Sequence, residues 1–341
     1  MKLTIKPIAQ RRQFINQSFA LTALAHLLPI SSANAATWPS RTVRIVLPFP
    51  PGGTSDIVAR LLADKLTTAL GHNVIVESKA GANGIIAGDF VAKSAADGHT
   101  LLFASAAHAS NASIYAKLPY DTARDFVPVA LVVPPGPMVI AVHTSLPVST
   151  VRELIEYARS NPGKLAYASG GIGNSLHLAG EMLGQMAGVS LLHVPYKGAA
   201  PALNDLLSGQ VQFMFNSALA VAPFVKQGRL RLIAQTGAKR SSALPADLPT
   251  VQEAGLSGFE VSGWFGLFAP AKTPIDIVQR INLETNRAMA LPELREKLAL
   301  LGGADVPTLS SDSFTTFVNS ETTRYAKVAK AAGLNLETPA Q

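Results

Sequence analysis

The chain of 341 residues contains no cysteine. It can therefore form no disulfide, no cysteine-ligated zinc site and no thiolate nucleophile. Charged residues are also scarce, because they make up 15% of the chain, against about a quarter of a typical soluble domain. The 26 glycines and 23 prolines are spread along the chain, which excludes a collagen-like repeat and a low-complexity disordered protein. The length suits two domains, each with its own core.

The N-terminus predicts a secretory signal peptide of residues 1–35. Four basic residues and no acid precede an apolar stretch at 19–30, and a small-residue cleavage site ends at Ala35. The apolar stretch is shorter than the roughly 20 residues that span a bilayer. The Arg-Arg pair at 11–12 resembles a twin-arginine export signal, but Gln10 stands where that motif has Ser or Thr. Both this route and the ordinary secretory route stay open, and either predicts an exported, periplasmic protein.

The leader also accounts for most of the positive charge. The whole chain has 29 basic and 22 acidic residues, a net charge of +7. Removal of the four basic residues of the leader leaves 25 against 22, a net charge of +3 on the mature protein. No run of Lys or Arg interleaved with aromatic residues remains, so we expect no nucleic-acid partner.

Short apolar runs alternate with helical patterns from residue 43 onward, which predicts an α/β fold with parallel, doubly wound sheets. The predicted strands are 43–47, 74–77, 100–104, 139–142, 165–168, 191–194, 213–216 and 230–234. Apolar residues at three- and four-residue spacing predict helices over 55–70, 151–160, 176–187 and 199–208. Thr150 is a candidate N-cap, and Gly71, Gly188 and Gly209 are candidate helix stops.

The C-terminal part has a different pattern. An extended stretch at 259–269 is followed by helices predicted at 273–290, 292–301 and 310–332. Because these helices need a sheet to pack on, we expect the chain to return to its N-terminal lobe. Crossings near 134–137 and 257–263 would then form a two-strand hinge. The expected division is lobe 1 at 36–137 plus 258–341 and lobe 2 at 138–257.

Two similar glycine-rich turns, at 48–55 and 169–175, each lead from a predicted strand into a predicted helix. Glycine lets the chain turn tightly and lets a ligand approach the main chain. The first N–H groups of a helix lack internal partners and lie at the positive end of its dipole. Neither turn has the Gly-Lys-Ser/Thr of a P-loop, so a nucleoside triphosphate is disfavoured. Two such turns on two hinged lobes predict a clamp for a small anion.

The order and spacing of several motifs closely resemble the Bug/TctC family, the extracytoplasmic solute receptors of tripartite tricarboxylate transporters. The motifs are VRIVLPFPPGG at 43–53, GANG at 81–84, ADG at 96–98, KLPYD at 117–121, HLAGE at 177–181, HVPYKG at 193–198, PADLPTVQEAG at 245–255 and WFGL at 264–267. The resemblance covers about residues 38–335. It implies a two-lobed periplasmic-binding-protein (venus-flytrap) fold, type II-like, with a double-crossover hinge.

The resemblance also implies the ligand and its contacts. The ligand would be a small organic carboxylate, either a di- or tricarboxylate or an aromatic or amino-acid-like acid. It would be delivered to membrane permease subunits by a protein that we expect to be a monomer, without catalytic residues, metal or cofactor. The first-lobe loop and the end of the third strand would contribute Phe49, Gly52, Gly53, Thr54, Ser55, Ser105 and Ala106. The second-lobe loop would contribute Ser169, Gly171, Ile172, Gly173, Asn174 and Ser175.

Three further residues belong to the expected site. Asn216 stands where family members often have Asp, which favours a plain carboxylate over an amino acid. His177 forms either a hydrogen bond at a helix start or a contact in the cleft. Its spacing from Glu181 suits a metal pair, but no third ligand joins them. Trp264 forms either hinge packing or a cleft wall.

Two other functions stay open. A receptor of the same fold could present its closed form to a sensor kinase. An exported serine hydrolase would use Ser175, because 173–177 superficially resembles a nucleophile elbow; its last residue is not glycine, which disfavours that function.

Overall fold

The computed structural model describes residues 38–299, 301 and 307–331. The predicted signal peptide at 1–35 lies outside the described residues. None of the described helices is long and apolar enough to cross a membrane.

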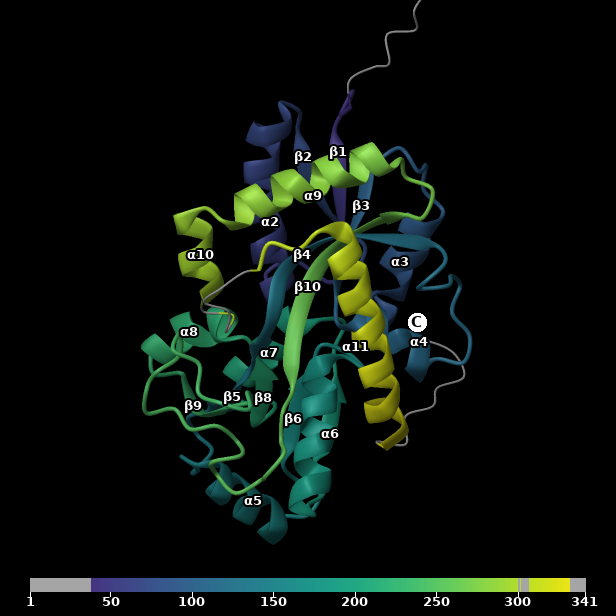
Figure 1. Ribbon diagram of the computed structural model, residues 1–341. Coiled ribbons are helices and arrows are strands. Elements are labelled where there is room, and N and C mark those ends of the chain that lie inside the picture. The colour runs from purple at the N-terminus through teal and green to yellow at the C-terminus, as the bar shows by residue number, and fades with distance from the viewer. Residues whose placement is uncertain (1–37, 300, 302–306, 332–341) are drawn as a thin grey trace, which may run out of the picture. The chain divides into compact units, whose positions relative to one another are not determined.

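The first of two five-stranded sheets has the strand order β2-β1-β3-β10-β4 (Figure 1). Its strands are β1 (Val43–Leu47), β2 (Val74–Ser78), β3 (Thr100–Ser105), β4 (Phe126–Pro137) and β10 (Ser262–Pro270). Strand β1 pairs in parallel with β2 and β3, whereas β10 is antiparallel to both β3 and β4.

The second sheet has the order β7-β6-β8-β5-β9. Its strands are β5 (Val139–His143), β6 (Ala166–Ser169), β7 (Leu192–Pro195), β8 (Phe213–Asn216) and β9 (Leu230–Gln235). Strand β6 is parallel to β7 and β8, and β5 is antiparallel to β8 and β9.

The two sheets therefore repeat one arrangement of three parallel strands followed by two strands that reverse direction twice. In this arrangement β1 corresponds to β6 and β3 corresponds to β8. Each sheet has its point of reversed strand order beside these strands, and ligands of open α/β sheets bind outside the carboxyl ends of strands at such points. The pair of glycine-rich turns follows β1 and β6 and so occupies equivalent positions in both sheets.

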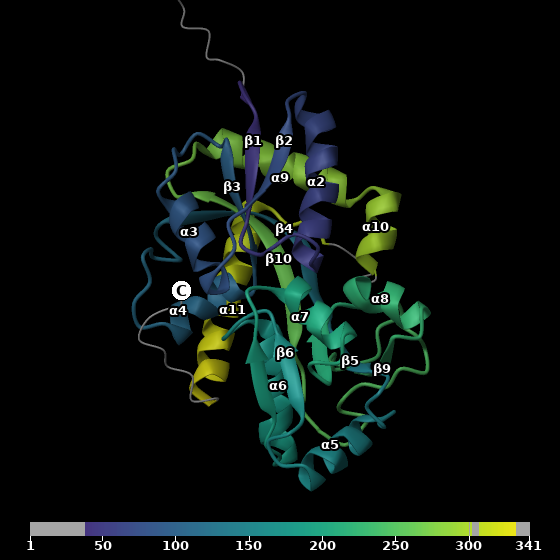
Figure 2. The same ribbon diagram turned by 180° about the vertical axis from the view of Figure 1, so that it is seen from behind.

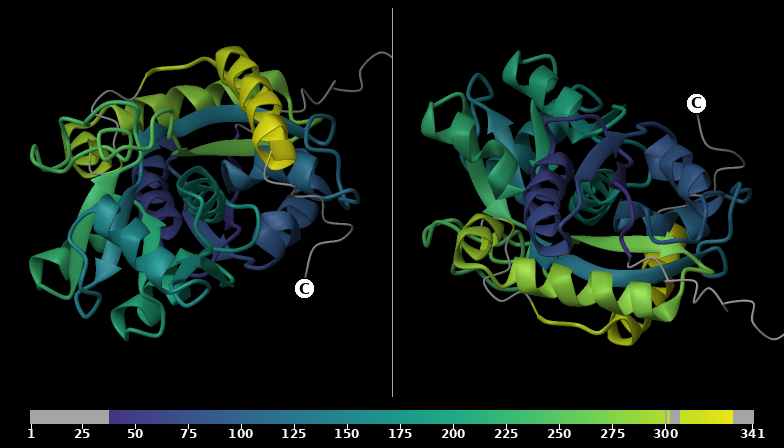
Figure 3. Two further views of the ribbon diagram at one scale, coloured as in Figure 1. Left: turned by 90° about the horizontal axis from the view of Figure 1, so that it is seen from below. Right: turned by 90° about the horizontal axis from the view of Figure 1, so that it is seen from above.

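Helices cover the first sheet from both ends of the chain. They are α2 (Thr54–Leu70), α3 (Ile85–Ala92), α4 (Ala107–Ile114), α9 (Ile275–Met289), α10 (Pro292–Ala299) and α11 (Ser311–Ala331), together with the 3-10 turn η2 (Ala82–Gly84). The C-terminal helices α9 and α11 both pack against β4, and Figure 3 shows them along the β4–β10 pair. The predicted return of the chain to its first sheet is confirmed.

The second sheet carries α5 (Val151–Ser160), α6 (Ser175–Ala187), α7 (Ala199–Leu207) and α8 (Ala218–Lys226), visible from behind in Figure 2. The predicted cap is present, because Thr150 Oγ1 accepts a hydrogen bond from the N–H of Glu153 at 3.1 Å. Gly71 and Gly188 end α2 and α6 in the left-handed conformation, with φ of 68° and 61°. A β-carbon is unfavourable there, which explains why glycine stands at both stops.

The chain passes between the sheets twice. Met138 alone separates β4 from β5, and the return from β9 reaches β10 at Ser262. The first passage adjoins the predicted crossing at 134–137, and the second, which begins after Gln235, ends at Ser262 inside the one predicted at 257–263. The exact bounds of the two lobes stay a prediction.

Two expectations are wrong in detail. The sheets are mixed rather than parallel, because strands that re-enter a sheet after a passage run against their neighbours. The second difference is β4, a strand of 12 residues that contains Pro128, Pro134, Pro135 and Pro137. Proline lacks a donor for a sheet interior, but β4 is an edge strand, where the missing N–H leaves no partner unpaired. Helices α3, α4 and α8 were not predicted either.

Candidate functional site

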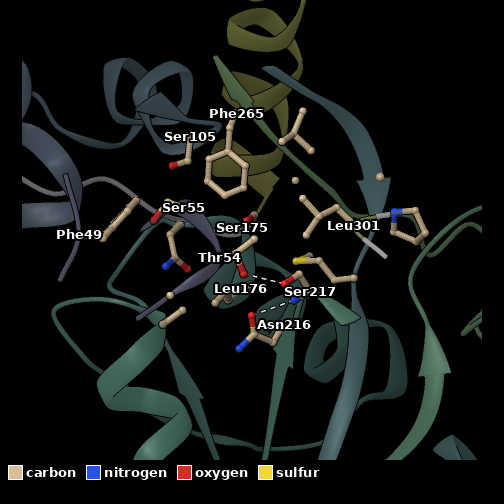
Figure 4. A pocket seen from close by; sticks show the side chains of 18 of the residues that line it. Phe49, Thr54, Ser55, Ser105, Ser175, Leu176, Asn216, Ser217, Phe265 and Leu301 are labelled. Atoms are coloured by element: carbon tan, nitrogen blue, oxygen red, sulfur yellow. Dashed lines mark hydrogen bonds between the residues drawn. The ribbon is translucent and has the colours of Figure 1, made fainter. Parts of the chain in front are cut away.

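A pocket lies between the carboxyl ends of β1 and β3 in one sheet and those of β6 and β8 in the other (Figure 4). The pocket is partly open to solvent. Its described lining consists of Phe49, Pro50, Gly53, Thr54, Ser55, Ser105, Val133, Gly136, Pro137, Met138, Asn174, Ser175, Leu176, Ala199, Asn216, Ser217, Gly263, Phe265 and Leu301.

The turn after β1 leads directly into α2, whose N-cap is Gly53. Ser78 donates a hydrogen bond to the carbonyl of Phe49 at 2.7 Å, which ties the turn to the neighbouring strand β2. Thr54 and Ser55 follow the cap and are buried. Among the described residues the N–H groups of Thr54 and Ser55 meet no acceptor, as is usual in the first turn of a helix. They remain available to a ligand.

The turn after β6 leads in the same way into α6. Its N-cap is Asn174, whose Oδ1 accepts a hydrogen bond from the N–H of His177 at 3.0 Å. The N–H groups of Ser175 and Leu176 meet no acceptor within the part of the chain that the structure describes. The second turn thus offers the same pair of donors from the other sheet.

The end of β8 completes the floor of the pocket. Ser217 is the N-cap of α8, and its Oγ lies 2.6 Å from Thr54 Oγ1, so the hydroxyls at the starts of α8 and α2 contact each other across the two sheets (Figure 4). Asn216 is buried, and its Oδ1 accepts from the N–H of Ser217 at 2.8 Å.

Five helices of the described chain begin at this lining. Helices α2, α6 and α7 contribute their first residues, and Ser105 and Ser217 precede α4 and α8. Each helix start carries a partial positive charge, and these charges converge on the pocket. None of the described lining residues carries a formal charge of either sign. The arrangement suits an anion that is held by N–H groups and hydroxyls without a buried cationic partner.

The remaining walls are apolar. Figure 4 shows Phe265 and Leu301 across the pocket from Thr54 and Ser217. Val133 and Met138 also line it, from β4 and from the passage between the sheets. The site therefore combines polar helix starts with an apolar surface that suits a short hydrocarbon chain.

The structure brings eight of the sixteen expected site residues into the lining. They are Phe49, Gly53, Thr54, Ser55, Ser105, Asn174, Ser175 and Asn216. The other eight lie outside the described lining, and they are Gly52, Ala106, Ser169, Gly171, Ile172, Gly173, His177 and Trp264. Several of these have backbone donors that are already occupied; for example, the N–H of Gly52 bonds Asp56 Oδ2 at 3.0 Å, and that of Ala106 bonds the carbonyl of Trp264 at 3.2 Å.

Ser169 and His177 lie beneath the second turn and support it from inside. Ser169 is fully buried, and its Oγ lies 2.7 Å from His193 Nε2 and 3.2 Å from the N–H of Gly171. His177 Nδ1 accepts a hydrogen bond from the N–H of Gly173 at 3.0 Å, so this nitrogen is unprotonated. Burial lowers the pKa of both histidines to about 4. His177 therefore makes a hydrogen bond at the helix start.

Trp264 packs in the core of the first sheet. Its side chain is 1% exposed, its Nε1 donates to Glu321 Oε2 at 2.9 Å, and its ring meets Phe314 and Phe317 edge on. The neighbouring Phe265 alternates to the other face of β10 and lines the pocket instead.

Several residues of the pocket lining were not predicted from the sequence. Alternation along β10 from a buried Trp264 would have indicated Phe265. Ser217 follows a predicted strand and precedes a helix, which is the same signal as in the two glycine-rich turns, but without glycine. Val133 and Met138 lie in a proline-rich segment that gives no strand signal, and Leu301 comes from a distant helix end.

The described residues contain no group of three side chains that could hold a metal ion. His177 Nε2 lies 3.5 Å from Glu181 Oε1, but Tyr167 donates to the same oxygen at 2.7 Å. Among the described residues no base contacts the Ser175 hydroxyl, and the His177 nitrogen that could accept a proton bonds Gly173. The geometry gives no support to a serine nucleophile.

Comparison with known proteins agrees with the geometry. Residues 58–334 match the model of the tripartite tricarboxylate transporter family receptor, TctC. BugT of Bordetella pertussis is 35% identical over 89% of this chain and 93% of its own length.

Two solved structures from Rhodopseudomonas palustris share the fold. Rpa4515, solved with adipate, is 38% identical, has a TM-score of 0.84, and is aligned over 88% of this chain and 99% of that one. MatC, solved with bound malate, is 33% identical, has a TM-score of 0.80, and is aligned over 85% and 99%. The chain belongs to the TctC family of tripartite tricarboxylate transporter receptors, whose two-lobed periplasmic-binding-protein fold it shares.

Proposed function

We propose that this protein is a periplasmic receptor that captures a small organic carboxylate in the pocket between its sheets and delivers it to membrane permease subunits. The observation that carries the proposal is the convergence of five helix starts on a pocket whose described lining has no charged side chain. In such a site an anion gains hydrogen bonds from N–H groups and hydroxyls. Its relatives Rpa4515 and MatC hold adipate and malate.

The ligand that fits best is a plain dicarboxylate with a short aliphatic body. One carboxylate meets the N–H groups of Ser55 and Ser175, and the hydrocarbon chain lies against Phe265 and Leu301. Asn216 supplies an amide rather than a carboxylate, and its oxygen already bonds Ser217. The described lining thus contains no anionic partner for the ammonium group of an amino acid.

Capture operates by closure of two lobes, with residues 36–137 and 258–341 in one and 138–257 in the other. Each lobe supplies one of the two helix starts, so a bound carboxylate is fully coordinated only when the lobes meet. Binding therefore shifts the population toward the closed form. Micromolar affinity corresponds to about 8 kcal/mol, a magnitude that a few charge-assisted hydrogen bonds and apolar contact can reach. The receptor acts as a monomer and catalyses no reaction.

Isothermal titration calorimetry on the protein without its leader tests this function. Adipate, succinate and malate are titrated beside adipamide, which keeps the chain of adipate but replaces both carboxylates with neutral amides. We expect micromolar binding of at least one dicarboxylate and no measurable heat with adipamide. Equal binding of adipate and adipamide, or no heat with any carboxylate, would contradict the proposal.

A substitution in the pocket lining tests whether the ligand binds there. Thr54→Val keeps the shape of the side chain and removes the hydroxyl that contacts Ser217 and lines the pocket. We expect the Kd for the dicarboxylate to rise about tenfold to a hundredfold, because one hydrogen bond to a charged group contributes about 1.5 to 3 kcal/mol. Thr316→Val on the exposed face of α11 is the matched control and leaves Kd unchanged.

A further inference from the structure

The segment Gly171, Ile172 and Gly173 lies next to the pocket, yet none of the three lines it. Near the two glycines lie Ile114 of α4 and Asn83 of η2 from the first lobe, together with the carbonyl of Tyr196 from the second lobe. A β-carbon at Gly173 would lie 2.7 Å from Ile114 Cδ1, and one at Gly171 would lie 3.7 Å from Asn83 Oδ1. The Gly171–Gly173 part of the turn after β6 thus contacts the first lobe outside the pocket lining, whereas Asn174 and Ser175 line the pocket.

The backbone of Gly173 makes hydrogen bonds to both lobes. Its N–H donates to His177 Nδ1 at 3.0 Å, within its own lobe. Its carbonyl accepts a hydrogen bond from Ser110 Oγ at 3.1 Å, from the first lobe. Tyr115 OH reaches the preceding carbonyl, that of Ile172, at 3.5 Å. Both first-lobe donors are buried, with Ser110 1% exposed.

We propose that Ser110 and Tyr115 form a closure latch. In this latch the first-lobe hydroxyls of Ser110 and Tyr115 donate hydrogen bonds to the second-lobe carbonyls of Gly173 and Ile172, respectively, without touching the ligand. The inference rests on the proposed function, because the latch matters only if binding requires the lobes to meet. His177 is the matching positioning residue of the second lobe, since its Nδ1 accepts from the N–H of the Ile172–Gly173 peptide, whose carbonyl is the one that Tyr115 reaches.

The latch stabilises the closed form independently of ligand chemistry. Its bonds exist only when the lobes are together, so they add to the closed state alone. When the lobes part, Ser110 still has a partner, because its Oγ lies 3.2 Å from the carbonyl of Ala107 in its own helix. The net effect of Ser110 is therefore modest, and the two hydroxyls together act more strongly than either alone.

The latch predicts a uniform change of affinity. In Ser110→Ala the Kd should rise about threefold for every dicarboxylate that the wild type binds, and in Ser110→Ala/Tyr115→Phe about tenfold. The ranking of ligands should stay as in the wild type. Because the latch forms after the ligand has entered, the dissociation rate should rise while the association rate stays the same.

The experiment is stopped-flow binding of adipate, succinate and malate to wild type and variants, with thermal unfolding of the ligand-free proteins in parallel. Ser94→Ala is the matched control, because Ser94 also donates to a backbone carbonyl, at 2.8 Å, but only within the first lobe. The control should leave both rate constants unchanged. The ligand-free melting temperature of Ser110→Ala should equal that of the wild type within about 2 °C.

The latch is overturned if the double variant keeps the wild-type dissociation rate, or if its affinity changes for one ligand and not for the others. A fall of the ligand-free melting temperature with unchanged rate constants would also overturn it, because Ser110 would then serve folding alone. Failure of the wild type to bind any carboxylate is a separate outcome that contradicts the proposed function, before the variants are measured.

Discussion

The rings of His177 and His193 lie in contact beneath the turn that follows β6, with centroids 4.0 Å apart. Glu181 and Tyr167 lie beside the pair, and the Tyr167 hydroxyl donates to Glu181 Oε1 at 2.7 Å and to the backbone carbonyl of His177 at 3.4 Å, and to neither imidazole ring. His177 acts as a neutral ring, since its Nδ1 accepts from a backbone N–H. His193 is neutral near pH 7 because burial lowers its pKa to about 4. The turn of the second lobe is therefore fixed by two side chains that must stay uncharged.

This requirement predicts loss of stability in acid. Burial lowers the pKa of His108, His177 and His193 to about 4, whereas an unfolded histidine titrates near 6.5. Between about pH 6.5 and pH 4 the unfolded chain binds more protons, so the free energy of unfolding falls as the pH drops. We expect a fall on the order of 1 kcal/mol per histidine by pH 5.

Thermal unfolding from pH 7 to pH 4.5 measures this fall. His177→Asn removes one of the three groups, so its melting temperature should depend less steeply on pH than that of the wild type. His72→Asn is the control, because His72 is exposed on the surface. An identical slope for wild type and His177→Asn would show that His177 is not held neutral.

Asn216 predicts a change of ligand charge preference. Asn216→Asp places an anion in the pocket, where it repels a bound carboxylate. We expect the Kd for adipate to rise at least about tenfold, or about 1.4 kcal/mol. Calorimetry of Asn319→Asp, which adds the same charge on the exposed face of α11, should match the wild type. Unchanged adipate binding in Asn216→Asp would mean that the carboxylates lie elsewhere.

A substitution at Trp264 distinguishes a role in core packing from a role in ligand binding. Trp264→Phe removes the donor to Glu321, a carboxylate that is 6% exposed and keeps Arg324 as its partner. We expect the protein to lose about 1 to 3 kcal/mol of unfolding free energy, through one hydrogen bond and lost packing. Denaturant unfolding measures the loss. The Kd for adipate should not change, and a weaker Kd would place Trp264 in the ligand site after all.

At the scale of elements, sequence periodicity predicted the central strands well. Strands β1 and β8 have the expected ends, and β2, β3, β5, β6, β7 and β9 differ from the prediction by one residue at one or both ends. Strand β10 begins three residues later than the predicted extended stretch. These strands are apolar runs bounded by polar or glycine residues, so a local pattern determines them. Strand β4 was not predicted because its four prolines argue against a strand. They are compatible with one only because β4 lies at the edge of the sheet.

Part of the site was predictable and part was not. The donors at the starts of α2 and α6 follow from local sequence, since a glycine-rich turn between strand and helix is visible in the chain. Local sequence does not determine whether a residue of such a turn faces the pocket or the other lobe. Gly53 lines the pocket, whereas Gly173 contacts Ile114 of the other lobe. Leu301 and Met138 reach the pocket only through tertiary packing.

Helix α6 packs so closely on β6 that one position requires glycine. A β-carbon at Gly180 would lie 2.1 Å from Tyr167 Cε2, so the buried ring would have to move. We expect Gly180→Ala to lower the free energy of unfolding by about 1 to 3 kcal/mol, measured by denaturant titration. In Tyr167→Leu, which removes the ring, the same change should cost less. Equal costs in the two backgrounds would contradict this packing.

At the scale of the whole molecule, the repeated strand order explains why one ligand meets two equivalent turns. Strands β1 and β6 stand at the same place in their sheets, so the helix starts that follow them both border the pocket. If the ligand closes the lobes, small-angle scattering should show a smaller radius of gyration with saturating adipate than with adipamide. An unchanged radius, together with measured binding, would contradict closure.

The most direct measurement for the central claim is a crystal structure of the protein without its leader, grown with the tightest-binding dicarboxylate. We expect one carboxylate within hydrogen-bond reach of the N–H groups at the starts of α2 and α6, directly or through one water molecule, with the hydrocarbon body against Phe265 and Leu301. A carboxylate that is paired instead with a lysine or arginine side chain, outside this pocket, would contradict it.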